Sequence, residues 1–167
     1  LLPRDALQDM PLLYVAAQLN ALRWRYSYGR KCFREKLANV SLNLPMVHGA
    51  GGWRIDEEAV RRIFPREFMT FIPPKATPGY FDIPQLRWRL FNILELFDLK
   101  RGDFHSIADL SLGSYMTVSR ISVDNGVVGY FEKPDSAKVY KRGLITISTV
   151  GGDAFVQLDS FICTDNV

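Results

Sequence analysis

Basic and aromatic side chains alternate in one short window of this chain, between positions 23 and 36. The window holds Arg23, Trp24, Arg25, Tyr26, Tyr28, Arg30, Lys31, Phe33, Arg34 and Lys36, with Glu35 as the only acidic residue. Cations attract phosphates through counterion release, and aromatic rings stack on bases or sugars. The window therefore indicates nucleic-acid binding, with Tyr28, Arg30 and Lys31 as candidate contacts. The alternative is that Tyr26 and Tyr28 only pack a helix turn onto a sheet.

A second group of candidates surrounds the dipeptide Asn125-Gly126, which separates two apolar runs. Asn-Gly between apolar runs predicts a hairpin with a primed turn. Ser119, Arg120 and Asn125 would then supply donors and acceptors that read base edges or hold phosphates. The alternative is an exposed turn in which Asn125 and Gly126 only set the backbone geometry.

A third group precedes an expected strand at 144–149. It consists of Lys138, Tyr140, Lys141 and Arg142. Its residue types suit the clamping of phosphates, and an ordinary charged loop is the alternative.

Signs of catalysis, of a metal site and of a cofactor are weak. Cys32 and Cys163 are far apart and lack the spacing of metal ligands, which predicts two free thiols in a reducing cytoplasm. Gly151-Gly152 lacks the frame of a nucleotide-binding loop. We find no nuclease or methyltransferase signature. The sequence thus predicts a non-catalytic protein without metal or cofactor, and its apolar runs are too short to cross a membrane.

Composition and periodicity predict an α+β fold with a curved, mostly antiparallel sheet and a few short helices. The chain has 167 residues, 47% of them hydrophobic, which is enough for a core, and its net charge of +3 is modest. Helices are expected at 12–22, 31–37 and 56–64, the last with Asp56 as N-cap. Strands are expected at 40–44 (ended by Pro45), 87–91, 115–121, 127–131, 144–149 and 154–158, and an extended segment at 71–84.

Two stretches resemble the two halves of one known domain. Residues 97–167 carry Ser119, the run Asn125-Gly126-Val127-Val128-Gly129-Tyr130 and the run Gly143-Leu144-Ile145-Thr146-Ile147. These resemble the opening half of a target-recognition domain from the DNA specificity subunits of type I restriction-modification systems and related type II enzymes. Residues 11–45, with Tyr28-Gly29-Arg30-Lys31 and Leu44-Pro45, resemble its closing half.

The opening half comes first in that family, so the order here implies permuted halves. The expected division is a closing half at 1–45, a spacer with a short helix and a Pro-rich segment at 46–90, and an opening half at 91–167. The two halves are expected to pack together, within one chain or between two copies that swap halves. The spacer lacks heptads and is rich in proline at 71–84, which favours the type II relatives.

The resemblance implies sequence-specific recognition of double-stranded DNA in the cytoplasm. Methyltransferase and endonuclease activities would lie on partner subunits or domains. One alternative is the recognition portion of a single-chain restriction-methylation enzyme. Another is a β-rich protein-binding or carbohydrate-binding module with Trp53, Trp88 and the aromatic loops as its platform. The DNA target itself is not predictable, because base choice depends on loop shape.

Overall fold

The computed structural model describes residues 1–5, 7–63, 86–103 and 105–164, and it has the expected α+β composition. Its helices are α1 (Asp9–Ala21), α2 (Arg34–Leu37), α3 (Glu57–Ile63) and α4 (Ile93–Leu96), with short 3-10 turns at Arg23–Arg25, Ile107–Asp109 and Asp124–Gly126. Its strands are β1 (Leu2–Pro3), β2 (Ser41–Gly49), β3 (Gly52–Ile55), β4 (Arg87–Asn92), β5 (Phe97–Asp98), β6 (Leu112–Val118), β7 (Val127–Phe131), β8 (Leu144–Ile147), β9 (Ala154–Gln157) and β10 (Ile162–Cys163). The extended segment expected at 71–84 lies outside the described residues.

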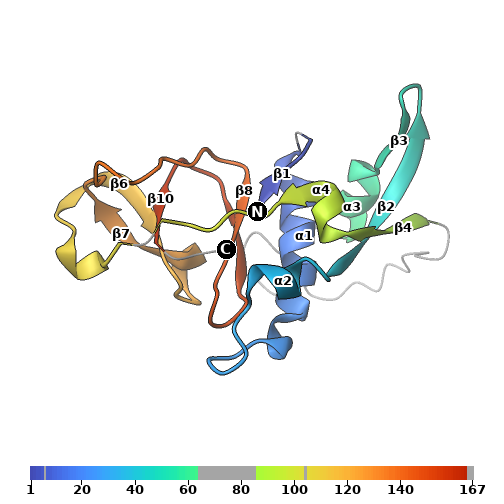
Figure 1. Ribbon diagram of the computed structural model, residues 1–167. Coiled ribbons are helices and arrows are strands. Elements are labelled where there is room, and N and C mark those ends of the chain that lie inside the picture. Colours follow the sequence, from blue (N-terminus) through green and yellow to red (C-terminus); the bar gives the residue numbers. More distant parts are fainter. Residues whose placement is uncertain (6, 64–85, 104, 165–167) are drawn as a thin grey trace, which may run out of the picture.

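The strands form several small sheets. One sheet has the order β3-β2-β4 and is antiparallel, and another has the order β10-β6-β7, in which β10 runs parallel to β6. β8 and β9 form a hairpin, and β1 pairs with β5. The β10-β6-β7 sheet and the β3-β2-β4 sheet lie on opposite sides of β8 and α1 (Figure 1).

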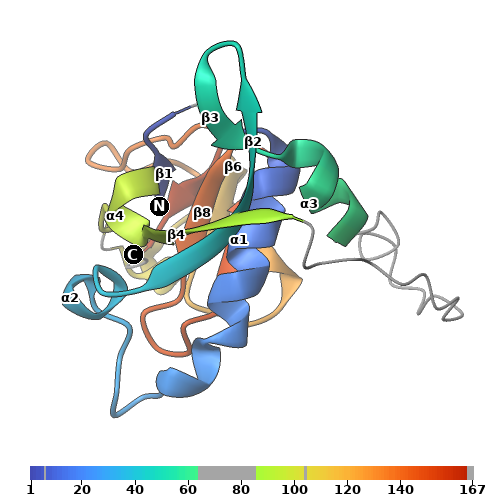
Figure 2. The ribbon, with the colours of Figure 1, turned by 90° about the vertical axis from the view of Figure 1, so that its right-hand side faces the viewer.

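Helix α1 joins the two ends of the sequence in one core. Its apolar stripe includes Leu12, Val15 and Leu19, which are buried together with Ile145 and Ile147 of β8. The same cluster takes in Leu42 and Leu44 of β2, and Figure 2 shows β2 and β4 crossing in front of α1. Burying one such side chain stabilises the fold by about 1.5–3 kcal/mol. Residues from the two expected halves therefore pack in one core within the chain.

Two side-chain amides fix how α1 sits between the sheets. The Gln18 amide donates to the carbonyl of Asn43 at 3.0 Å and accepts from the Asn43 N–H at 3.0 Å. The Asn20 amide donates to the carbonyl of Ala154 at 2.8 Å and accepts from its N–H at 2.7 Å. Each amide thus makes the two hydrogen bonds that a residue of a neighbouring strand would make. The N–H and C=O groups of Asn43 and Ala154 are therefore satisfied.

Strand β2 is longer than expected because Pro45 does not end it. The carbonyl of Pro45 accepts from the Asp56 N–H at 2.9 Å, so its nitrogen also faces the β3 side. There the pairing with β3 begins only at Met46, and no ladder bond requires an N–H from Pro45. The expected strand end at Pro45 is wrong, and residues 46–55 and 87–92 complete the sheet that starts at Ser41.

Two predictions from local sequence are confirmed, the N-cap at Asp56 and a primed turn before β7. The Asp56 carboxylate accepts from the Ala59 N–H at 2.9 Å, so Asp56 does begin helix α3. A primed turn does precede β7, with positive φ at Asp124 (50°) and Asn125 (55°) and a bond from the Gly126 N–H to the Val123 carbonyl of 2.9 Å. The turn lies one residue earlier than Asn125-Gly126, at the end of an eight-residue connection, 119–126, which we call the arm.

Both cysteines are free and buried, and this gives a testable pH dependence. Burial raises the pKa of Cys32 and of Cys163 from the ordinary 9.0 to about 11. The unfolded chain therefore loses its thiol protons first, and stability that is complete below pH 9 falls as pH rises towards 11. We expect a loss of about 1–2 kcal/mol per thiol. Urea unfolding at pH 8 and pH 10 measures it. An equal fall in the Cys32→Ala/Cys163→Ala variant would contradict this assignment.

Candidate nucleic-acid interface

Several cationic side chains from distant segments meet around a cleft of about 410 Å³. Its lining residues are Lys31, Phe33, Arg34, Glu35, Leu99, Lys100, Arg101, Arg120 and Thr149. Five of these side chains are cations and one, Glu35, is an acid, so the described lining of the cleft has a formal charge of +4 (5 − 1). Such a concentration of positive charge favours phosphates or other anions. We call this site the basic cleft.

The segment before α2 is anchored so that Lys31 lines the cleft. The Cys32 N–H donates to the carbonyl of Thr149 at 2.9 Å, and the Cys32 side chain is buried. This fixes the positions of Lys31 and Phe33 on either side of it, and the Phe33 ring is 51% exposed. The Lys31 ammonium lies 5.3 Å from the centre of the exposed Tyr28 ring, a distance that permits a cation–π contact.

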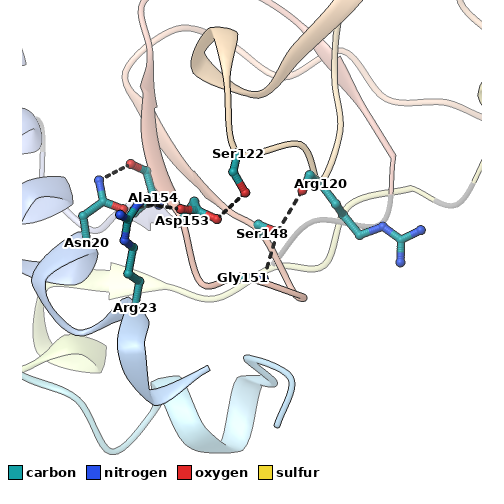
Figure 3. Close-up of polar contacts among 8 residues, drawn as sticks. All are labelled: Asn20, Arg23, Arg120, Ser122, Ser148, Gly151, Asp153 and Ala154. Carbon is teal, nitrogen blue, oxygen red and sulfur yellow. Dashed lines mark hydrogen bonds and ion pairs between the residues drawn. The ribbon is translucent and has the colours of Figure 1, made fainter. Parts of the chain in front are cut away.

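Arg120 enters the cleft from the arm, and the β8–β9 turn holds its backbone. The Ser148 hydroxyl donates to the Arg120 carbonyl at 3.0 Å and accepts from the Gly151 N–H at 3.3 Å. In Figure 3 the guanidinium of Arg120 extends away from these contacts. The turn therefore sets where the Arg120 side chain starts, while its charged end stays at the surface.

Asp153 connects the arm, the turn and the end of α1. Its carboxylate accepts from the Ser122 hydroxyl at 2.6 Å and from the Arg23 guanidinium at 3.2 Å (Figure 3). The Asp153 side chain is 8% exposed, whereas Arg23 is 63% exposed. A buried carboxylate needs such partners, and here each partner comes from a different segment. The wall that carries Arg120 is thus tied to the core.

The turn also needs glycine beside this carboxylate. Gly152 has φ = +73°, and a Cβ there would lie 2.4 Å from the Tyr26 ring. Both the backbone angle and the close ring exclude a larger residue without rearrangement.

The predicted group Lys138, Tyr140, Lys141 and Arg142 lies at the other end of β8 from the basic cleft. The Tyr140 ring stacks on Phe161 with centroids 5.4 Å apart, and burial raises the pKa of its hydroxyl. Arg142 pairs with Asp9 at 3.2 Å, and Lys138 and Lys141 are exposed. Tyr140 therefore has a packing role, and the three cations remain accessible.

Two predicted contacts on the arm also have internal partners. The Asn125 amide donates to the Val156 carbonyl at 3.0 Å and to the Gln157 side chain at 3.2 Å, which ties the arm to β9. The Ser119 hydroxyl accepts from that of Thr164 at 3.2 Å. Their predicted contacts with DNA stay predictions.

Of the predicted residues, the structure thus brings Lys31 and Arg120 together, with Tyr28 beside Lys31 and Arg30 exposed in the same loop. Sequence reasoning missed Lys100 and Arg101, which follow β5 and line the same cleft. Their only signal was a basic pair in a turn, and most such pairs are simply solvated.

No protein-family model, curated protein or solved structure matches the chain. Within residues 1–63 and 86–164, apart from positions 6 and 104, no group of His, Cys, Asp and Glu side chains has a metal-binding arrangement. Over the same part of the chain, no helix combines the length and apolar character needed to cross a bilayer.

Proposed function

We propose that this protein is a DNA recognition module, the specificity component of a restriction-modification system, which binds double-stranded DNA in a sequence-dependent way. The observation that carries the proposal is the basic cleft, where Lys31 and Arg120, two residues singled out in opposite halves of the sequence, line one site. Two halves that jointly grip one duplex would require such a meeting point.

The charge and shape of the basic cleft support backbone contacts with DNA. Five cations around about 410 Å³ suit one or more phosphates, and the three exposed cations at the other end of β8 supply a second set. Phosphate contacts fix the register of a protein on the duplex, and base contacts then specify the sequence. The arm, which carries Arg120, is the candidate for base contacts.

Chemistry on the DNA would come from methyltransferase and endonuclease partners in the cytoplasm. The proposed role of this chain is to position them, and it requires no cofactor of its own. Because α1 packs on β8 and β9 of the same chain, dimerisation by swapping halves is not needed to complete the core.

Selection from a randomised duplex library tests the proposal, and we expect one defined sequence to be enriched. Arg120→Ala should then lower the ratio of specific to random binding. Lys141→Ala should weaken both equally and reduce the salt slope by about 1. Equal losses of specific and random binding in Arg120→Ala would count against base reading. Enrichment of no sequence at all would contradict sequence recognition itself.

The alternatives are less well supported. Trp53 pairs with His48 and Trp88 pairs with Pro45, three positions apart on β2, so the two indoles lie on opposite faces of the sheet. Both residues line one hollow together with Arg87 and Arg89, and these cations favour an anionic ligand over an uncharged sugar. The recognition portion of a single-chain restriction-methylation enzyme would use the same basic cleft, and the coding sequence on either side of this segment distinguishes it.

A further inference from the structure

The outer end of the β3-β2-β4 sheet carries a second cationic and aromatic surface. The register pairs His48 with Trp53 and Met46 with Arg87, which places all four side chains on one face. The Trp53 ring is 51% exposed. The Arg87 guanidinium lies 5.4 Å from its centre, and the His48 ring meets it edge-on at 5.2 Å.

A hollow beside the Trp53 ring is positively charged. It has a volume of about 440 Å³. The described residues that line it are Met46, Trp53, Arg87, Trp88 and Arg89, and none of these is a carboxylate. Arg89 pairs with Glu95 at 3.0 Å just outside this lining. Among the described residues, no carboxylate forms an ion pair with Arg87, so its charge is available to an anion.

We infer that this surface binds single-stranded nucleic acid, with a base stacked on Trp53 and phosphates held by Arg87 and Arg89. Bases and phosphates alternate along a strand. An exposed indole can stack on a base while the neighbouring guanidinium groups bind the adjacent phosphates. In a duplex the faces of the bases are stacked on one another, so only the bases of an unpaired strand can stack on the Trp53 ring. An uncharged sugar would leave the Arg87 guanidinium without an anion, whereas Arg89 already pairs with Glu95.

The surface is separate from the basic cleft. The β2–β3 hairpin and α2 lie at different ends of the molecule in both Figure 1 and Figure 2. The inference therefore does not rest on the duplex-binding proposal, and either one can fail without the other.

Fluorescence anisotropy with labelled twelve-nucleotide strands of deoxythymidine or of uridine tests it at low salt. Trp53→Ala should weaken binding about tenfold, as the loss of one stacked base does. Arg87→Ala should also weaken it and should lower the salt slope by about 0.7. Equal affinity for both strands indicates that base and phosphate are recognised, and preference for one identifies DNA or RNA as the ligand.

Trp24→Ala is the matched control. Trp24 is 69% exposed and also has an arginine, Arg25, 5.5 Å from its ring, but it lies outside the hollow. We expect this variant to bind the strands normally, and circular dichroism confirms that each variant is folded. Equal losses in Trp24→Ala and Trp53→Ala would overturn the inference. So would displacement of the strand by polyglutamate as readily as by unlabelled strand, since that would indicate a site for acidic peptides.

Discussion

Reversing two charges in the basic cleft, Lys31→Glu together with Arg120→Glu, is expected to reduce affinity for duplex DNA by at least about a hundredfold. Hydrogen bonds to charged groups contribute about 1.5–3 kcal/mol each, and two are lost. The two introduced carboxylates and Glu35 would also balance the three remaining cations, which removes the net charge of the cleft. Titration of labelled duplex over a range of salt concentrations measures the loss, and the salt slope should fall by about 2.

The control carries the same change of charge at another place. Arg61→Glu together with Arg62→Glu alters two cations in the last turn of α3, away from the cleft lining. We expect its affinity to change by less than about threefold. If both double variants bind equally weakly, only the overall charge matters. If the Lys31 and Arg120 variant binds as well as the unmodified protein, the cleft is not the DNA site.

Leu19→Asp is expected to destabilise the whole fold strongly, including strands far from Leu19 in sequence. Leu19 is 3% exposed within the cluster that also holds Ile145 and Ile147. An uncompensated charge buried there costs about 3–5 kcal/mol, a large part of the 5–15 kcal/mol that holds most domains folded. Urea unfolding gives the loss of stability. Hydrogen exchange shows whether β8 and β9 lose protection together with α1.

Leu112→Asp makes the same chemical change at the surface. Leu112 is 83% exposed on β6, so we expect a change in stability within about 0.5 kcal/mol. Retained protection of β8 and β9 in the Leu19→Asp variant would show that the two ends of the chain fold as independent units. The proposal that the shared core unfolds cooperatively would then be wrong.

Local signals in the sequence predicted most elements of the fold. The apolar spacing of 12–22 predicted α1, and the run at 127–131 predicted β7 with its observed bounds. Asp56 predicted the start of α3, because capping is a local interaction. The length of β2 was not predictable, since Pro45 is tolerated only where the β3 ladder has not begun, and that register is a tertiary property.

The candidate site was only partly predictable for the same reason. Lys31 stood out because cations and aromatic rings alternate around it, and Arg120 because it precedes a turn. That both line one cleft depends on the anchoring of Cys32 by Thr149 and of Arg120 by Ser148, contacts between distant segments. The internal partners of Asn125 and Tyr140 depend on β9 and on Phe161, which the local sequence does not specify.

The pairing of Asn20 with Ala154 also has a consequence for biosynthesis. These residues are 134 positions apart, so during translation α1 leaves the ribosome long before its partner strands exist. The part of its apolar stripe that packs on β8 and β9 stays uncovered for that time, which is when chaperones and proteases act on nascent chains. Closing so long a loop also slows the final folding step. We therefore expect the core to form only after β9 has been synthesised. The yield of folded protein in cells should depend on chaperones that bind α1 before then.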